Sequence, residues 1–124
     1  MEDLMGKLRH FAKEREWERF HSPKNLAMAL SVEVAELLET FQWLTEEESR
    51  NLTPEKLAEV KDEIGDVMIY LLNIADKLGV DALDAAREKL LKNIEKYPAE
   101  TVKGRAVKYT QLDGNGGAGS KGGK

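Results

Sequence analysis

Two residue pairs, Ser22-Pro23 and Thr53-Pro54, constrain the fold of this chain more than any other feature of its sequence. Each places an N-cap residue before a proline, whose fixed φ suits the first position of a helix. Gly79 and Tyr97-Pro98 are typical helix ends. No segment between these signals shows sustained strand-like alternation, so the sequence predicts an all-α fold.

Apolar periodicity and these signals predict four helices, arranged as a four-helix bundle-like single domain. A short helical turn capped by Thr45 and Glu48 is expected between the second and the third. From Gly114 onward, six of eleven residues are glycine, which is typical of a flexible tail. The domain is therefore expected to cover residues 1–112, followed by a tail at 113–124. The four helices are expected at about Leu4–Phe20, Pro23–Leu44, Pro54–Gly79 and Ala82–Lys96.

The charge balance excludes one broad class of partner. With 23 acidic and 19 basic side chains, the net charge of −4 gives no general attraction to nucleic acid polymers or anionic membranes. The longest nearly apolar run, Val67–Ala75, contains Asn73 and is far shorter than the roughly 20 residues of a membrane-spanning helix. The chain lacks cysteine and its acidic N-terminus lacks a secretory signal, so a cytoplasmic location is expected.

Two predicted helices each carry a pair of acids on one face. Glu33 and Glu36 share the second helix, and Glu63 and Asp66 share the third, both pairs at i and i+3 spacing. An isolated pair of this kind is more often a solvated surface. Here, however, Glu33 and Glu63 interrupt apolar stripes, so they are expected at or near the core. Uncompensated burial of like charges is unfavourable, and a bound cation would relieve it.

Magnesium is the cation that this set of acids favours, with manganese as a substitute. The four carboxylates supply hard oxygen ligands, and magnesium takes its other ligands from water and substrate phosphates. The chain has no cysteine, and its only histidines, His10 and His21, do not suggest a zinc site. A di-iron bundle ranks lower, because neither helix offers the Glu-x-x-His pair that such sites use.

The acids form two motifs, Glu33-x-x-Glu36 and Glu63-x-x-Asp66, separated by twenty-six residues. This arrangement resembles the signature of the MazG-like all-α NTP pyrophosphatase superfamily. The resemblance covers roughly Leu4 to Leu112. One departure is that Val32 and Val34 flank Glu33, where relatives often have small residues. Further segments are similar to the dCTP pyrophosphatase branch, namely Trp17–Leu30, Phe41-Gln42-Trp43, Asp66–Leu71, Asn93, Tyr97-Pro98 and Lys108-Tyr109-Thr110.

The resemblance implies a MazG-type fold and magnesium-dependent hydrolysis of a nucleoside triphosphate between its α- and β-phosphates. The four acids would hold the metal, and Glu33 or Glu36 would accept the proton of the attacking water. The first substrate to expect is dCTP or a modified dCTP, in a role of nucleotide-pool housecleaning. A related pyrophosphatase acting on dUTP or on several dNTPs is the alternative within enzymes.

The resemblance also implies a set of substrate-binding residues. Trp17 and Trp43 would sandwich the base with His21 beside it, since an aromatic face can stack on any base. Without the resemblance, the tryptophans would be interpreted as core or interface residues and the lysines as solvated surface. Tyr70 and Asn93 would face the sugar or phosphates, and the phosphate neighbours would be Lys89 and Lys108, ahead of Lys24 and Lys96.

Association with further copies is expected, because the helices carry more apolar surface than one short bundle can bury, and the resemblance points to dimers or dimers of dimers. A rival interpretation from another class is a non-catalytic helical module, whose acids bind a cation only to hold an oligomer together.

Overall fold

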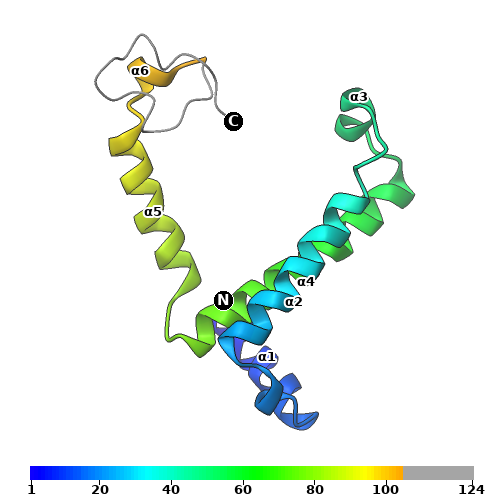
Figure 1. Cartoon of the computed structure of the whole chain (residues 1–124), viewed down its shortest axis with the longest axis vertical. Helices are drawn as coiled ribbons and strands as arrows, with labels where there is room; N and C mark the ends of the chain where they lie inside the picture. Colours follow the sequence, from blue (N-terminus) through cyan, green and yellow to red (C-terminus); the bar gives the residue numbers. More distant parts are fainter. Residues whose placement is uncertain (105–124) are drawn as a thin grey trace. The chain divides into compact units, whose positions relative to one another are not determined.

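The computed structural model describes residues 1–104, and every regular element in that range is a helix. The all-α prediction is confirmed for this part of the chain (Figure 1). None of its helices is both long and apolar enough to span a bilayer. The elements are α1 (Glu2–Glu14), the 3-10 helix η1 (Glu18–Phe20), α2 (Pro23–Glu39), α3 (Glu46–Arg50), α4 (Pro54–Lys77), α5 (Ala82–Lys96) and α6 (Ala99–Val102).

Three helices begin where their capping residues predict. The Ser22 hydroxyl accepts the backbone N–H of Asn25 at 3.1 Å at the start of α2, and Thr53 accepts that of Lys56 at 3.1 Å at the start of α4. Thr45 forms a complete capping box at α3. Each cap satisfies a backbone donor that would otherwise lack a partner, so these starts follow from local chemistry.

The first helix is shorter than predicted. It ends at Glu14, and Phe20 lies in the separate element η1. Glu16 has a left-handed φ of 55°, and the N–H of Trp17 reaches back to the carbonyl of Ala12 at 2.9 Å. This is the Schellman cap that glycine usually forms. Because Glu16 occupies the glycine position, the sequence carried no visible stop signal there.

The predicted end of the second helix was also wrong. The prediction extended it to Leu44, but α2 ends at Glu39 and residues 40–43 form turns. The hydroxyl of Thr40 donates to the carbonyl of Leu37 at 2.6 Å, and the Thr40 N–H donates to the same carbonyl at 3.1 Å. These bonds tighten the last turn and satisfy a carbonyl that a continuing helix would have used.

The fourth predicted helix is present with its predicted bounds. It is α5, which ends at Lys96 just before Tyr97-Pro98. The short helix α6 follows this proline and was not predicted. The chain divides into two compact units, Met1–Ala82 and Leu83–Lys124, which are described separately.

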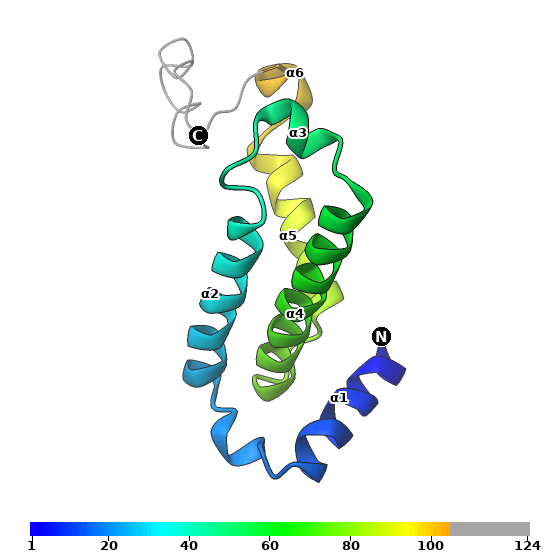
Figure 2. The same ribbon diagram turned by 90° about the vertical axis from the view of Figure 1, so that its right-hand side faces the viewer.

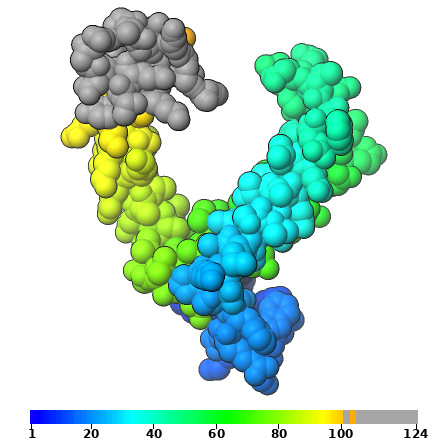
Figure 3. All heavy atoms as spheres, viewed as in Figure 1, coloured from blue at the N-terminus to red at the C-terminus, as the bar shows by residue number. Residues whose placement is uncertain are grey.

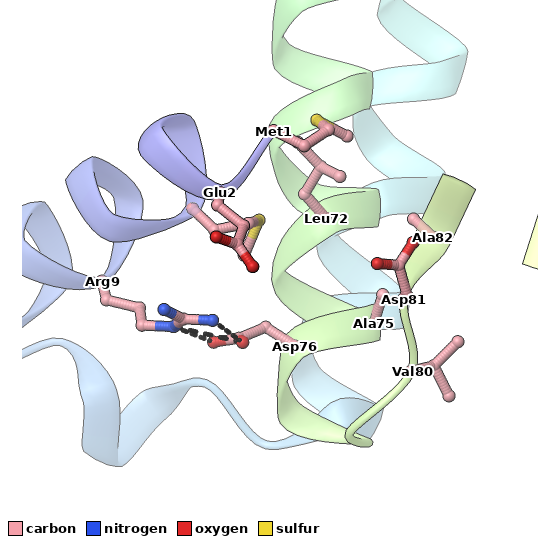
Figure 4. Close-up of a pocket in the computed structure, with 10 residues that line it drawn as sticks. Met1, Glu2, Arg9, Leu72, Ala75, Asp76, Val80, Asp81 and Ala82 are labelled. Carbon is pink, nitrogen blue, oxygen red and sulfur yellow. Dashed lines mark hydrogen bonds and ion pairs between the residues drawn. The ribbon is translucent and has the colours of Figure 1, made fainter. Parts of the chain in front are cut away.

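In the first unit, α2 and α4 pack side by side, and α1 contacts α4 (Figure 2). The buried core is small and consists of Ala12, Leu26, Val60 and Leu72. On the side of α1, Arg9 reaches Asp76 of α4, with Nη2 2.7 Å from Oδ1 (Figure 4). The α2–α4 pair is thus the main framework on which a site can be built.

The same pair leaves many apolar side chains exposed. No other element of the first unit covers the face of α2 that Figure 3 shows. Exposed apolar area on this scale is typical of a surface that another protein covers. The large apolar residues of α2 and α4 that remain more than 40% exposed are Met28, Val32, Val34, Leu38, Leu57, Ile64, Met68 and Leu71.

Candidate active site

Packing of α2 against α4 brings three of the predicted acids together. One carboxylate oxygen from each of Glu33, Glu36 and Glu63 lies within 4.8 Å of the other two. All three residues are half-buried. We refer to these three residues as the carboxylate cluster. The i and i+3 spacing places both acids of a pair on one face of their helix, and the packing of α2 on α4 brings the two faces together.

Asp66 lies at the edge of the cluster. It is exposed, and it does not belong to the group of oxygens that lie within 4.8 Å of one another. Its carboxylate is nevertheless close enough to Glu33 and Glu63 to help raise the pKa of both. All four predicted acids therefore share one electrostatic environment, although only three converge closely.

The cluster carries repulsion that the described chain does not relieve. Burial is the main cause that raises the pKa of Glu33, followed by repulsion from Glu36, Asp66 and Glu63. Burial also comes first for the raised pKa of Glu63, followed by repulsion from Glu36 and Asp66. Within residues 1–104, no lysine, arginine or histidine forms an ion pair with any of these acids. The negative charge thus has no internal counterion in this range.

The carboxylate cluster also contains a buried oxygen that the described residues leave unpaired. Oε1 of Glu63 is buried and has no hydrogen-bond partner among the described residues. A buried polar atom of this kind needs an explanation, and an ion is one. The three residues of the cluster all offer carboxylate oxygens, which are the ligands that hard divalent cations prefer. The residues present therefore fit a divalent cation of the magnesium type.

An aromatic hollow of about 350 Å³ lies next to Asp66, between α1, α4 and the two residues that flank η1. Its volume is within the range of sites for small organic ligands. Asp66 belongs to its wall and so links it to the acids. The structure brings together here Trp17 and His21, which the resemblance places at the base, and Tyr70, which it places at the sugar or phosphates. The lining residues are Lys7, Leu8, Phe11, Ala12, Trp17, His21, Asp66, Ile69, Tyr70 and Asn73.

Local structure holds Trp17 in this position. The Schellman cap turns the chain back after α1, and the Trp17 ring packs edge-on against Phe11 with 5.7 Å between ring centres. His21 follows at the end of η1, and Asn25 binds this segment through a hydrogen bond from its side chain to the carbonyl of Phe20 at 3.2 Å. Burial, followed by the charge of Lys77, lowers the pKa of His21, so its imidazole is neutral at neutral pH.

Other predicted substrate residues are not gathered at this hollow. Trp43 follows α2 and is 86% exposed. Lys24 is exposed in the first turn of α2. Lys89, Asn93 and Lys96 lie on α5 in the second unit, and Lys108 lies outside the described residues. Their roles stay predictions.

Six of the ten lining residues were not among the site residues predicted from the sequence, and Phe11 and Asn73 are two of them. Phe11 was not singled out in the sequence, and Asn73 was noted only as a polar interruption of the run Val67–Ala75. A signal for Asn73 did exist, because it lies seven residues after Asp66 and so on the same face of α4. A second hollow, of about 390 Å³ around the Arg9–Asp76 pair, contains none of the predicted site residues (Figure 4).

Residues 1–104 form an all-α fold in which a carboxylate cluster with the ligand chemistry of a hard cation lies near an aromatic hollow. The sequence profile described as the MazG-like family matches residues 28–112. The chain belongs to the MazG-like family, which confirms the resemblance in its motifs.

Characterised relatives support this assignment. The proteins named dCTP pyrophosphatase 1 from Mus musculus, Bos taurus and Homo sapiens are each 40% identical over 114 residues. These matches cover 90% of this chain and 67%, 68% and 67% of the respective relatives. The crystal structure of a pyrophosphatase from Archaeoglobus fulgidus superposes with a TM-score of 0.75 at 44% identity, covering 79% of this chain and 92% of that one.

Proposed function

We propose that this chain is a magnesium-dependent nucleoside triphosphate pyrophosphohydrolase. It hydrolyses a deoxynucleoside triphosphate, first dCTP or a modified dCTP, to the monophosphate and pyrophosphate. The observation that carries the proposal is the convergence of Glu33, Glu36 and Glu63 oxygens within 4.8 Å without an internal counterion. The similarity to proteins named dCTP pyrophosphatase supports the choice of substrate.

In this proposal Glu33, Glu36, Glu63 and Asp66 hold the divalent ion. When bound, magnesium offsets the repulsion of the acids and the charge of the triphosphate oxygens. Water adds to the α-phosphorus, the bond from that phosphorus to the bridging oxygen breaks, and pyrophosphate leaves. Glu33 or Glu36 accepts the proton of the attacking water, because a carboxylate within reach is an effective general base. Manganese substitutes for magnesium.

The aromatic hollow receives the nucleoside. Trp17 supplies a face on which the base stacks, the neutral His21 lies beside it, and Tyr70 faces the sugar or the phosphates. The hollow shares Asp66 with the acidic site, which supports a nucleotide extending from one to the other. Trp43, Lys89, Asn93 and Lys108 are included as substrate residues on the family resemblance alone.

The proposed working form is a homodimer or a dimer of dimers in the cytoplasm. The exposed apolar faces of α2 and α4 support it, because burial of such area stabilises by roughly 25 cal/mol per Å². We also propose that residues 1–112 form the functional domain and that the glycine-rich residues 113–124 are a tail.

The test is pyrophosphate release from each common dNTP, with magnesium and with a chelator. We expect release that depends on magnesium and is fastest with dCTP. Faster release from dUTP would keep the reaction and change the base preference. If no dNTP gives pyrophosphate with magnesium or manganese, the proposal is wrong, and the cation-stabilised helical module would replace it.

A further inference from the structure

Asn73 stands out in the aromatic hollow because its side chain differs in kind from its neighbours. It is half-buried on α4 and is the only carboxamide among the residues that line this hollow. No described residue forms a hydrogen bond with that carboxamide. Its donor and its acceptor are thus both available to whatever enters.

The apolar surroundings of Asn73 make its donor and its acceptor important for ligand binding. Leu8, Phe11 and Ile69 make much of the hollow apolar. A flat apolar ligand that enters will displace water from the carboxamide, and hydrogen bonds then have to be replaced. A ligand with a flat ring and a polar edge both packs against the apolar walls and replaces the hydrogen bonds of the displaced water. A purely apolar ring does only the first.

The position of Asn73 along α4 indicates which part of a bound nucleotide it would face. It lies seven residues beyond Asp66, which corresponds to about 10.5 Å along a helix. Asp66 marks the end of the hollow next to the carboxylate cluster, where the phosphates are proposed to bind. A nucleotide with its phosphates there would carry its base toward Asn73, farther along the same helix.

We propose that Asn73 is a specificity-determining residue that hydrogen-bonds the polar edge of the nucleobase; this inference rests on the proposed function. A carboxamide presents a donor and an acceptor side by side, and cytosine offers the matching pair in its ring nitrogen N3 and its exocyclic amino group. Stacking on Trp17 holds the ring, and Asn73 distinguishes a ring with this edge from one without it.

Equilibrium binding tests this role apart from catalysis. The probes are two triphosphates with a non-hydrolysable methylene group between the α- and β-phosphorus, one carrying cytosine and one carrying a difluorobenzene ring of similar size. Both are titrated, with magnesium, into the full chain and into Asn73→Leu. We expect the full chain to prefer the cytosine probe about tenfold, and Asn73→Leu to lose that preference while binding the difluorobenzene probe within about twofold of the full chain.

Asn51→Leu serves as the matched control, since it removes an exposed carboxamide outside the hollow. Asn73→Ala gives the same comparison if the leucine variant does not fold. An unchanged preference in Asn73→Leu, or equal weakening of both probes, would overturn the role. Pyrophosphate release by the unmodified chain is measured separately, so a failure of the proposed reaction is distinguishable from a failure of base recognition.

Discussion

Two acidic side chains on α4, Asp76 and Glu63, differ in how their charge is balanced. Asp76, near the C-terminal end of the helix, receives hydrogen bonds from both Nε and Nη2 of Arg9 (Figure 4). That hydrogen bonding is the main cause that lowers the pKa of Asp76. Glu63, earlier on the same helix, faces Glu36 and Asp66, and burial and repulsion raise its pKa.

The difference separates an acid that the fold balances from the acids that are proposed to hold a cation. Asp76 is balanced by the fold, because its partner comes from α1 and the pair joins two helices. The carboxylate cluster is left unbalanced by residues 1–104, although its members sit on the best-packed pair of helices. Because the fold supplies a counterion for Asp76 and none for the carboxylate cluster, an external cation is favoured at the cluster.

The largest expected effect is on turnover by Glu36→Gln. The substitution keeps the size of the side chain and removes one charged oxygen ligand, so pyrophosphate release from dCTP should fall by at least about 10²–10³-fold. Glu39→Gln, on the same helix but exposed, should retain activity. Circular dichroism should show both variants folded. Full activity in Glu36→Gln would remove this residue from the site.

A second effect is stabilisation by the ion. Under the proposed function magnesium binds only the folded cluster, so at 100-fold above its Kd it should raise Tm by roughly 10 °C. Glu63→Gln should show a much smaller rise, whereas Glu39→Gln should show the full rise. Thermal unfolding with magnesium and with a chelator provides the measurement. Equal rises in all three proteins would mean that magnesium acts elsewhere.

Variants of the Arg9–Asp76 pair should change the stability of the chain slightly without changing the effect of magnesium. Removing it with Asp76→Asn should lower Tm by only about 2–4 °C, because such partly exposed ion pairs contribute little. The rise caused by magnesium should be unchanged, because Asp76 does not belong to the carboxylate cluster. Thermal unfolding of Asp76→Asn, Arg9→Met and the double variant measures the coupling. Loss of the magnesium effect in Asp76→Asn would break the distinction between Asp76 and the carboxylate cluster.

The smallest effect is the pH dependence of this pair. The pKa of Asp76 is lowered from the ordinary 3.8, so its contribution to stability is complete above that value and is lost as pH falls through the folded-state pKa. The difference in Tm between the unmodified chain and Asp76→Asn should therefore be constant above about pH 5 and shrink below about pH 4. A difference that grows on acidification would contradict the sign of the shift.

Local signals predicted most helix starts but not two helix ends. Ser22, Thr45 and Thr53 act through bonds to residues three positions away, so their sequence suffices. The left-handed backbone of Glu16 is held without the usual glycine, and no local pattern marks it. The packing of Trp17 on Phe11 offers a physical reason for it.

The sequence pattern revealed the acids of the candidate site but not the features that depend on packing between helices. The acids were found because i and i+3 pairs within apolar stripes are visible in one dimension. The closer convergence of Glu33, Glu36 and Glu63, with Asp66 at the edge, depends on the packing of α2 on α4. Asn73 was missed because its importance comes from apolar neighbours on α1, far away in sequence.

Direct titration with Mn²⁺, followed by electron paramagnetic resonance of the free ion, tests the central claim that the unbalanced acids form a cation site. We expect saturable binding by the unmodified chain and by Asp76→Asn, and at least about tenfold weaker binding by Glu33→Gln and Glu36→Gln. Binding that is absent, or that is equally strong in all four proteins, would contradict it.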